Sequence, residues 1–76
     1  MKPIPIKKYK AYLKSLGLYH KRTSASHEIW DKTDNSLLRP ITVDNNYSEV
    51  PILHIKTSLK SLGIKNSDFE RDIKNF

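Results

Sequence analysis

The feature that most constrains the fold of this chain is a change in the spacing of its apolar residues. Near both ends they recur at the period of about 3.6 residues that puts them on one helix face, and in the middle at the period of 2 typical of strands. The first helical stripe consists of Ile6, Tyr9, Leu13 and Leu16. The second consists of Ile52, Ile55, Leu59 and Leu62. The sequence therefore predicts two helices with a β-structured segment between them.

Local signals indicate where the two helices end. We expect the first helix over about 6–16, with Gly17 just after it, where a residue in the left-handed conformation is favoured. We expect the second helix over about 51–62. The pentapeptide Leu-Lys-Ser-Leu-Gly occurs at both helix ends, at 13–17 and at 59–63. We interpret this repeat as shared helix-end chemistry, an apolar pair followed by a glycine, rather than as a duplicated domain.

Between the predicted helices, three short runs are rich in residues that favour strands. These runs are at 18–22, 27–32 and 37–43. The segments that join them, 23–26 and 33–36, consist mainly of turn-forming residues, which predicts four-residue hairpin loops and an antiparallel meander. Pro40 has no N–H to donate to a ladder, so the third strand is expected at a sheet edge or with an irregularity.

The last part of the sequence predicts a polar loop and a short final helix. Residues 44–48 form the loop that leads to the second long helix. Ser67 and Glu70 have the spacing of a capping box, which predicts a helix that runs from there to about Lys74.

These elements together predict one small α+β domain over 1–76. Their order is α-β-β-β-α, with a three-stranded antiparallel sheet, both long helices on one face, and a C-terminal helix within 65–76. A chain of 76 residues hides only about 60% of its unfolded surface. It can close a single core, which excludes two-domain enzymes with a separate cofactor domain.

Composition narrows the class of protein further. The absence of cysteine excludes disulfides, thiolate zinc clusters and thiol nucleophiles, and favours a reducing compartment. No apolar run approaches the roughly 18 residues of a membrane span, and residues 1–6 lack the apolar run of a secretory signal, so we expect a cytoplasmic protein away from membranes. Fourteen Lys and Arg against eight Asp and Glu give a net charge of 14 − 8 = +6, which favours a polyanionic partner.

The predicted element order suggests how such a partner could be recognised. A small basic α-β-β-β-α domain is the architecture of double-stranded-RNA-binding domains, which contact phosphates and 2′-hydroxyls of A-form RNA. The main candidate for chemistry is His27, which follows Ser26 at the start of the predicted second strand.

Symmetric hairpin loops would surround His27 with groups suited to phosphate chemistry. Arg22 and Thr42 would lie opposite His27, and Arg39 would lie opposite Trp30. Imidazole can transfer protons near neutral pH, and a guanidinium binds phosphate and stabilises developing charge. This set suits metal-free cleavage of RNA, in which the 2′-hydroxyl of the substrate is the nucleophile.

The sequence resembles the HicA family, small ribonuclease toxins of bacterial type II toxin–antitoxin modules. The resemblance covers roughly 2–64 and rests on short strings in matching order and spacing. These strings are Lys2-Pro3-Ile4-Pro5, Leu13-Lys14-Ser15-Leu16-Gly17-Leu18, Ser26-His27 with Trp30, Glu49-Val50-Pro51, and Leu59 through Gly63-Ile64. Three positions depart from the family pattern. Ala25 replaces a Gly, Thr42 stands where many relatives have a second His, and Leu-His-Ile at 53–55 replaces Gly-Thr-Leu.

The resemblance implies a double-stranded-RNA-binding-like fold with His27 as the catalytic residue. It also implies cleavage of mRNA without a metal or another cofactor, neutralisation by a cognate HicB antitoxin, and an oligomer formed through that antitoxin. Candidate RNA contacts around the catalytic residue are Lys21, Arg22, Ser26, Trp30 and Arg39.

Several aromatic and imidazole side chains have simpler interpretations. For Trp30, a place in the core or in a cross-strand pair is slightly favoured over stacking on a base. Tyr9 and Tyr12 fit the edge of the core better than a nucleotide platform. His20 and His54 are assigned no functional role.

Other classes of function stay open on the sequence alone. The aspartates at 31, 34 and 44 lack the spacing of a divalent-ion site, so no metal is predicted. A non-catalytic RNA-binding module of the same fold would use its cations and Trp30 only to hold RNA. A protein-interaction domain would turn its basic face towards an acidic partner.

Overall fold

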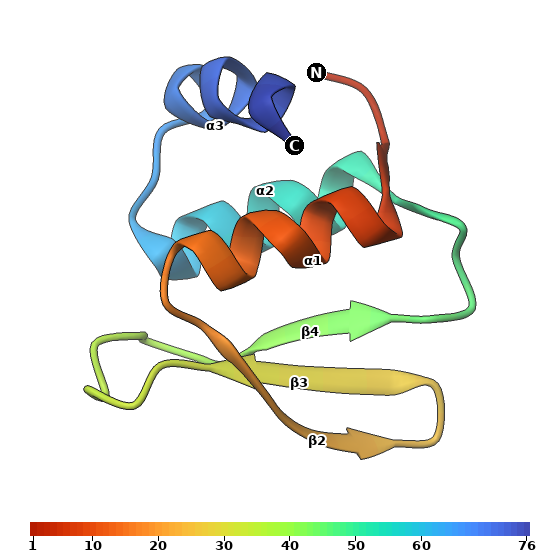
Figure 1. Ribbon diagram of the computed structural model, residues 1–76, viewed down its shortest axis with the longest axis vertical. Helices are drawn as coiled ribbons and strands as arrows, with labels where there is room; N and C mark the ends of the chain where they lie inside the picture. The colour runs from red at the N-terminus through yellow and green to blue at the C-terminus, as the bar shows by residue number, and fades with distance from the viewer.

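The computed structural model describes residues 1–76, and its base is a three-stranded antiparallel sheet (Figure 1). The strands are β2 (Tyr19–Ser24), β3 (His27–Asp31) and β4 (Ile41–Asp44), in the spatial order β2-β3-β4. The predicted meander is therefore confirmed. Its third strand is at an edge of the sheet, as the proline before it indicated.

The helices form two further layers above this sheet. Helices α1 (Ile6–Ser15) and α2 (Ile52–Leu62) lie together on one face of the sheet, within a residue of the predicted bounds. Helix α3 (Asn66–Asp72) and a 3₁₀ turn at Ile73–Asn75 lie over α1 and α2, on the side away from the sheet (Figure 1). The α+β class and the common face of the two long helices are confirmed. No helix is long and apolar enough to cross a membrane.

The repeated pentapeptide ends both long helices in the same way. Gly17 has a φ of +90° and Gly63 a φ of +70°, the left-handed region that glycine adopts without a steric penalty. In the first copy, the N–H of Leu18 donates to the carbonyl of Leu13 at 3.1 Å, and the equivalent bond after α2 measures 3.0 Å. Both ends have the 6→1 hydrogen bond of the Schellman motif, which confirms the interpretation as helix-end chemistry.

A short ladder that the sequence did not indicate brings the starts of the two long helices together. Strand β1 (Ile4–Pro5) pairs antiparallel with β5 (Glu49–Val50). The sequence predicted no strand in either segment. The N–H of Ile6 extends this contact by donating to the carbonyl of Ser48 at 3.0 Å. Because each strand leads directly into a helix, α1 and α2 start at the same end of the molecule (Figure 1).

The β2–β3 hairpin is tighter than the sequence predicted. Ser24 pairs with His27, so the loop has two residues instead of four. Ala25 in this turn has a φ of +53°, a conformation that two-residue hairpins require and that glycine or asparagine more often supplies. Counting back from this turn, Thr23 pairs with Glu28 and Arg22 with Ile29, and a register shift lies further along, between His20 and Arg22. The expectation that Arg22 lies directly opposite His27 is therefore wrong.

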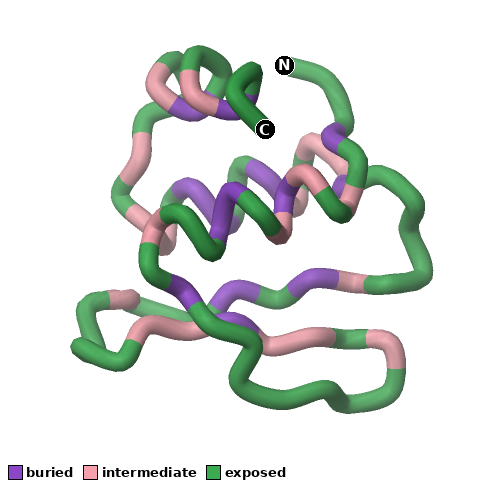
Figure 2. Tube along the Cα trace, in the orientation of Figure 1, coloured by how far each residue is buried: buried purple, intermediate pink, exposed green.

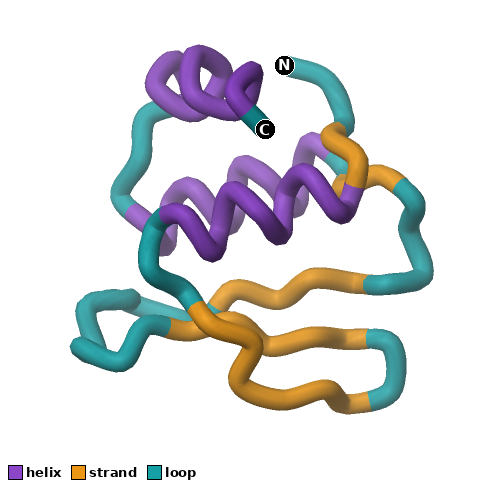
Figure 3. Tube along the Cα trace, in the orientation of Figure 1, coloured by secondary structure: helices purple, strands orange, loops and turns teal.

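The connection between β3 and β4 also differs from the expected hairpin. It covers residues 32–40 and projects from one end of the sheet (Figure 3). The longer connection shifts the pairing, so that Asp44 and not Thr42 lies opposite His27. A shift of two residues keeps Thr42 on the same sheet face, because side chains alternate with a period of two.

The same shift corrects the second predicted pair. Ile41, rather than Arg39, lies opposite Trp30. Strand β4 begins directly after Pro40, so this proline, whose nitrogen has no proton to donate to a ladder, lies outside the strand.

Helix α3 forms where expected, but not through the predicted cap. It begins at Asn66 after Lys65, and no side-chain hydrogen bond caps it, so the capping box of Ser67 and Glu70 is wrong. The ring of Phe69 is fully buried instead. Burial of this apolar side chain, rather than a terminal hydrogen bond, stabilises α3 on the layer below it.

The hydrophobic core fills the space between the three layers. Figure 2 shows buried segments along α1, α2, α3 and β4, whereas every residue of β2 is exposed. The core consists of Ile4, Tyr9, Tyr12, Leu13, Leu18, Trp30, Ile41, Val43, Val50, Ile55, Leu59, Phe69 and Ile73. Trp30 is thus a core residue, in agreement with its simpler interpretation, and Tyr9 and Tyr12 are buried more fully than the core edge expected for them.

Candidate functional site

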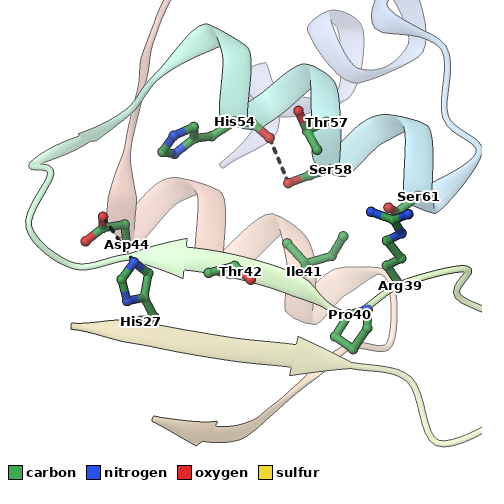
Figure 4. Close-up of a pocket in the computed structure, with 10 residues that line it drawn as sticks. All are labelled: His27, Arg39, Pro40, Ile41, Thr42, Asp44, His54, Thr57, Ser58 and Ser61. Carbon is green, nitrogen blue, oxygen red and sulfur yellow. Dashed lines mark hydrogen bonds and ion pairs between the residues drawn. The ribbon is translucent and has the colours of Figure 1, made fainter. Parts of the chain in front are cut away.

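A groove of about 410 Å³ opens between the edge strand β4 and helix α2 (Figure 4). Ten residues line it, and only one of them is hydrophobic. The sheet side supplies His27, Arg39, Pro40, Ile41, Thr42 and Asp44. The helix side supplies His54, Thr57, Ser58 and Ser61. This polar lining, which combines two imidazoles, a guanidinium and several hydroxyls, makes the groove the candidate functional site.

His27 lies at one end of the groove beside a carboxylate. It is the first residue of β3 and lies opposite Asp44, the last residue of β4, with 3.5 Å between Nε2 of His27 and Oδ2 of Asp44. The His27 side chain is 51% exposed and that of Asp44 only 18%. The carboxylate can orient the imidazole and stabilise the positive charge that forms when the ring takes up a proton, while the exposed ring can reach a ligand.

A clamp between two turns holds this pair in place. The backbone N–H of Asn45 donates to the carbonyl of Ser26 at 2.8 Å, and Nδ2 of Asn46 donates to Oγ of Ser26 at 2.9 Å. The N–H of Asn46 also donates to Oδ1 of Asp44 at 2.9 Å. Ser26, a predicted RNA contact, therefore ties the β2–β3 turn to the end of β4 and fixes the place of His27 relative to Asp44.

A charged network lies behind the histidine, on the face of the sheet that the helices cover. Carboxylate oxygens of Glu28 accept hydrogen bonds from Lys10 Nζ at 2.9 Å, Asn45 Nδ2 at 2.9 Å and Trp30 Nε1 at 3.1 Å. Partial burial alone would raise the pKa of Glu28, but the hydrogen bonds from Lys10, Asn45 and Trp30 and the charge of Lys10 outweigh it and lower this pKa to about 2. The network fastens α1 to the strand and the turn that carry the site.

The lowered pKa of Glu28 predicts a loss of stability in acid. The contribution of Glu28 is fully present above its unfolded pKa of 4.5 and disappears as the pH falls from there to about 2. When the pH falls from 6 to 2.5, the free energy of unfolding of the Glu28→Gln variant should fall by about 2 kcal/mol less than that of the wild type. Solvent screens this carboxylate little, because its side chain is only 15% exposed. Urea unfolding at both pH values measures this, with the exposed Glu49→Gln as the matched control. Equal acid losses in the wild type and the Glu28→Gln variant would contradict it.

The predicted cations separate into two groups. Arg39 lines the groove at the end away from His27 (Figure 4) and makes no ion pair. Arg22 lies on the outer face of the sheet, diagonal to His27, at a separation of about 7–8 Å that a long side chain can bridge. Lys21 belongs to β2, the edge strand on the far side of the sheet from β4, and its Nζ lies 3.7 Å from Oδ2 of Asp31. Arg39 therefore shares the groove with His27, whereas Lys21 and Arg22 do not line it.

Trp30 is not available as a stacking platform in this conformation. Its side chain is 2% exposed, in the core between the sheet and the helices. The ring of His20 stacks on it at a centroid distance of 5.7 Å, and Nζ of Lys14 lies 6.0 Å from the ring centroid. His20 thus lies away from the groove.

The sequence assigned no role to Asp44 and His54, the two other titratable residues of the groove beside His27 and Arg39. Asp44 carried no local signal, since its place opposite His27 follows from the strand register alone. His54 did carry one, because His54, Ser58 and Ser61 recur at helical spacing and form a polar stripe on a helix whose other face is apolar.

No three His, Asp or Glu side chains come together in a cluster that could hold a metal ion. No family model, no curated protein and no solved structure matches this chain. A function therefore has to be inferred from the groove and from the sequence resemblance.

Proposed function

We propose that this protein is a ribonuclease toxin of the HicA type, which cleaves mRNA in the cytoplasm with His27 as a general acid/base. The observation that carries the proposal is the His27–Asp44 pair, at 3.5 Å, at the end of a polar groove that also holds Arg39. A net charge of +6 supports RNA as the substrate, because attraction to phosphates supplies most of the sequence-independent affinity for nucleic acids.

The chemistry needs no group beyond those in the chain and the RNA. The 2′-hydroxyl oxygen attacks the adjacent phosphorus as its proton moves to a base. The bond from phosphorus to the 5′-oxygen breaks, and that oxygen takes a proton from an acid. The products are a 2′,3′-cyclic phosphate and a free 5′-hydroxyl. His27 transfers a proton in this scheme, Asp44 orients its ring, and a guanidinium such as that of Arg39 binds a phosphate of the substrate.

The proposal extends to the fold type and to a protein partner. The order of α1, the meander and α2, with both helices on one sheet face, supports a double-stranded-RNA-binding-like fold. A HicB-type antitoxin would neutralise the enzyme by covering the groove or by competing for its cations, and the two proteins would form an oligomer.

Cleavage of RNA in the presence of a chelator tests the proposed function. We expect the purified protein to cut mRNA in excess EDTA and to leave 2′,3′-cyclic phosphate ends, because the nucleophile comes from the substrate and the proton transfers from side chains. Gel analysis of end-labelled RNA, followed by identification of the 3′ ends, measures both results.

Two outcomes would overturn the proposal in different ways. Activity that disappears with EDTA and returns with Mg²⁺ would contradict the acid–base scheme, once RNA folding is controlled with a cation that does not support catalysis. RNA that is bound but stays intact would favour the non-catalytic RNA-binding module.

A further inference from the structure

The groove holds a second imidazole opposite the first. His54 is in the first turn of α2 and lines the same groove as His27. Figure 4 shows the two histidines at the same end of the groove, with Asp44 near them and Arg39 at the other end. His54 thus comes from the helix wall and His27 from the sheet wall, on opposite sides of the space that a ligand would occupy.

An aromatic contact fixes the His54 ring, and a hydrogen bond caps its backbone carbonyl. The rings of Tyr47 and His54 form a T-shaped pair with a centroid distance of 5.5 Å and an interplanar angle of 86°. The carbonyl of His54 accepts a hydrogen bond from Oγ of Ser58 at 2.9 Å, one turn further along the helix. His54 has no carboxylate partner, whereas His27 has Asp44.

Cleavage of RNA by its own 2′-hydroxyl needs two proton transfers at two different oxygens. One group removes the proton of the 2′-hydroxyl, and another protonates the departing 5′-oxygen on the far side of the phosphorus. Two imidazoles, one neutral and one protonated, serve both steps near neutral pH. A single histidine on one wall reaches one of these oxygens at a time.

We propose that His54 is the second catalytic residue of this site and shares the two proton transfers with His27. This inference rests on the ribonuclease function proposed above. His27 serves one of the two oxygens and His54 the other, with the phosphate between the walls of the groove. The hydroxyls of Thr57 and Ser61 and the guanidinium of Arg39 continue along the groove and accommodate the adjoining part of the RNA backbone.

The proposal predicts a change in the pH profile of cleavage as well as a loss of rate. The groups that face the two rings are Asp44, Tyr47 and, further along the groove, Arg39. The wild type should give a bell-shaped profile, since one imidazole has to be neutral and the other charged. His54→Gln should lose one limb of this bell and lower the rate by about 10²–10⁴-fold.

Two measurements separate proton transfer from a structural role, and two more verify folding. His54→Ala should regain part of its activity when imidazole is added to the solution, because the truncated side chain leaves room on the open groove. Binding of 2′-O-methyl RNA, which lacks the nucleophile, should stay within about threefold of wild type for His54→Gln, since an interaction made only in the transition state affects rate rather than binding. Circular dichroism and the urea midpoint verify that each variant is folded.

The matched control is His20→Gln, which removes a histidine on the covered side of the sheet, away from the groove. It should keep the wild-type rate and pH profile. If the wild type cleaves RNA and His54→Gln has the same rate and the same bell, the role of His54 is refuted while the ribonuclease function stands. If the wild type does not cleave RNA at all, the proposed function itself fails.

Discussion

Replacement of His27 with alanine is expected to lower the rate of RNA cleavage by about 10²–10⁴-fold while the fold stays intact. In the proposed mechanism the variant lacks a proton-transfer group, and its fold stays intact because the His27 side chain is 51% exposed and contributes little to packing. In cells, the variant should no longer arrest growth when expressed at the level of the wild type. A cleavage assay with purified proteins and a growth assay with matched expression measure the two effects.

A substitution of Asp44 should have a smaller effect on the cleavage rate than His27→Ala. Asp44→Asn keeps the size of the side chain but removes the charge next to the imidazole, so it should lower the rate less than His27→Ala. The unfolding midpoint of His27→Ala should be close to that of the wild type, because the removed ring leaves no buried cavity. Full activity of a folded His27→Ala protein would exclude this histidine from the mechanism.

Replacement of Phe69 with alanine is expected to destabilise the protein by about 3–5 kcal/mol. The side chain is fully buried between α3 and the layer below, where its ring packs edge-to-face on Tyr12 at 5.0 Å and on Tyr9 at 6.3 Å. A domain of this size has a total free energy of unfolding of roughly 4–11 kcal/mol. The variant should therefore lose most of its stability, with a far lower midpoint in urea or partial unfolding at room temperature.

Phe76 offers a matched aromatic control on the same tyrosine. Its ring packs edge-to-face on Tyr12 at 5.6 Å, but the residue is 42% exposed. Phe76→Ala should cost no more than about 1.5 kcal/mol, since little apolar area becomes exposed to water. Equal losses for the Phe69 and Phe76 variants would show that α3 is not part of the cooperative core.

The two substituted residues lie in different parts of the molecule. His27 belongs to a solvent-facing groove on one side of α2, whereas Phe69 belongs to the layer that covers the long helices on the side away from the sheet. The Phe69 variant should thus lose activity only in proportion to its unfolded fraction. At low temperature or in a stabilising osmolyte, its activity should recover, while that of the His27 variant should not.

The sequence alone determined the elements whose cause is local. Both long helices follow from apolar residues at helical spacing, and both end at a glycine because the left-handed residue after a helix is a property of a few neighbouring positions. From Pro40 the sequence predicted a strand at the sheet edge, and β4 lies at that edge, although Pro40 itself precedes the strand. The sequence also selected His27 and Arg39, and the structure places both in one groove.

Only the tertiary structure decided the register of the strands, and with it the partner of His27. A hairpin loop of two residues and a long connection over 32–40 shift the pairs, and no local pattern distinguishes these loops from the expected ones. Asp44 therefore takes the place expected for Thr42.

Contacts between segments that are distant in the sequence could not be predicted either. The β1–β5 ladder joins the first residues of the chain to those before α2, and it brings the start of α2, with His54, to the end of the sheet where His27 lies. Such contacts depend on how the layers pack and on loop closure over tens of residues. Neither produces a local sequence pattern that could be recognised at one position. The sequence thus selected His27 and Arg39, and only the packing of strands and helices placed Asp44 and His54 in the same groove.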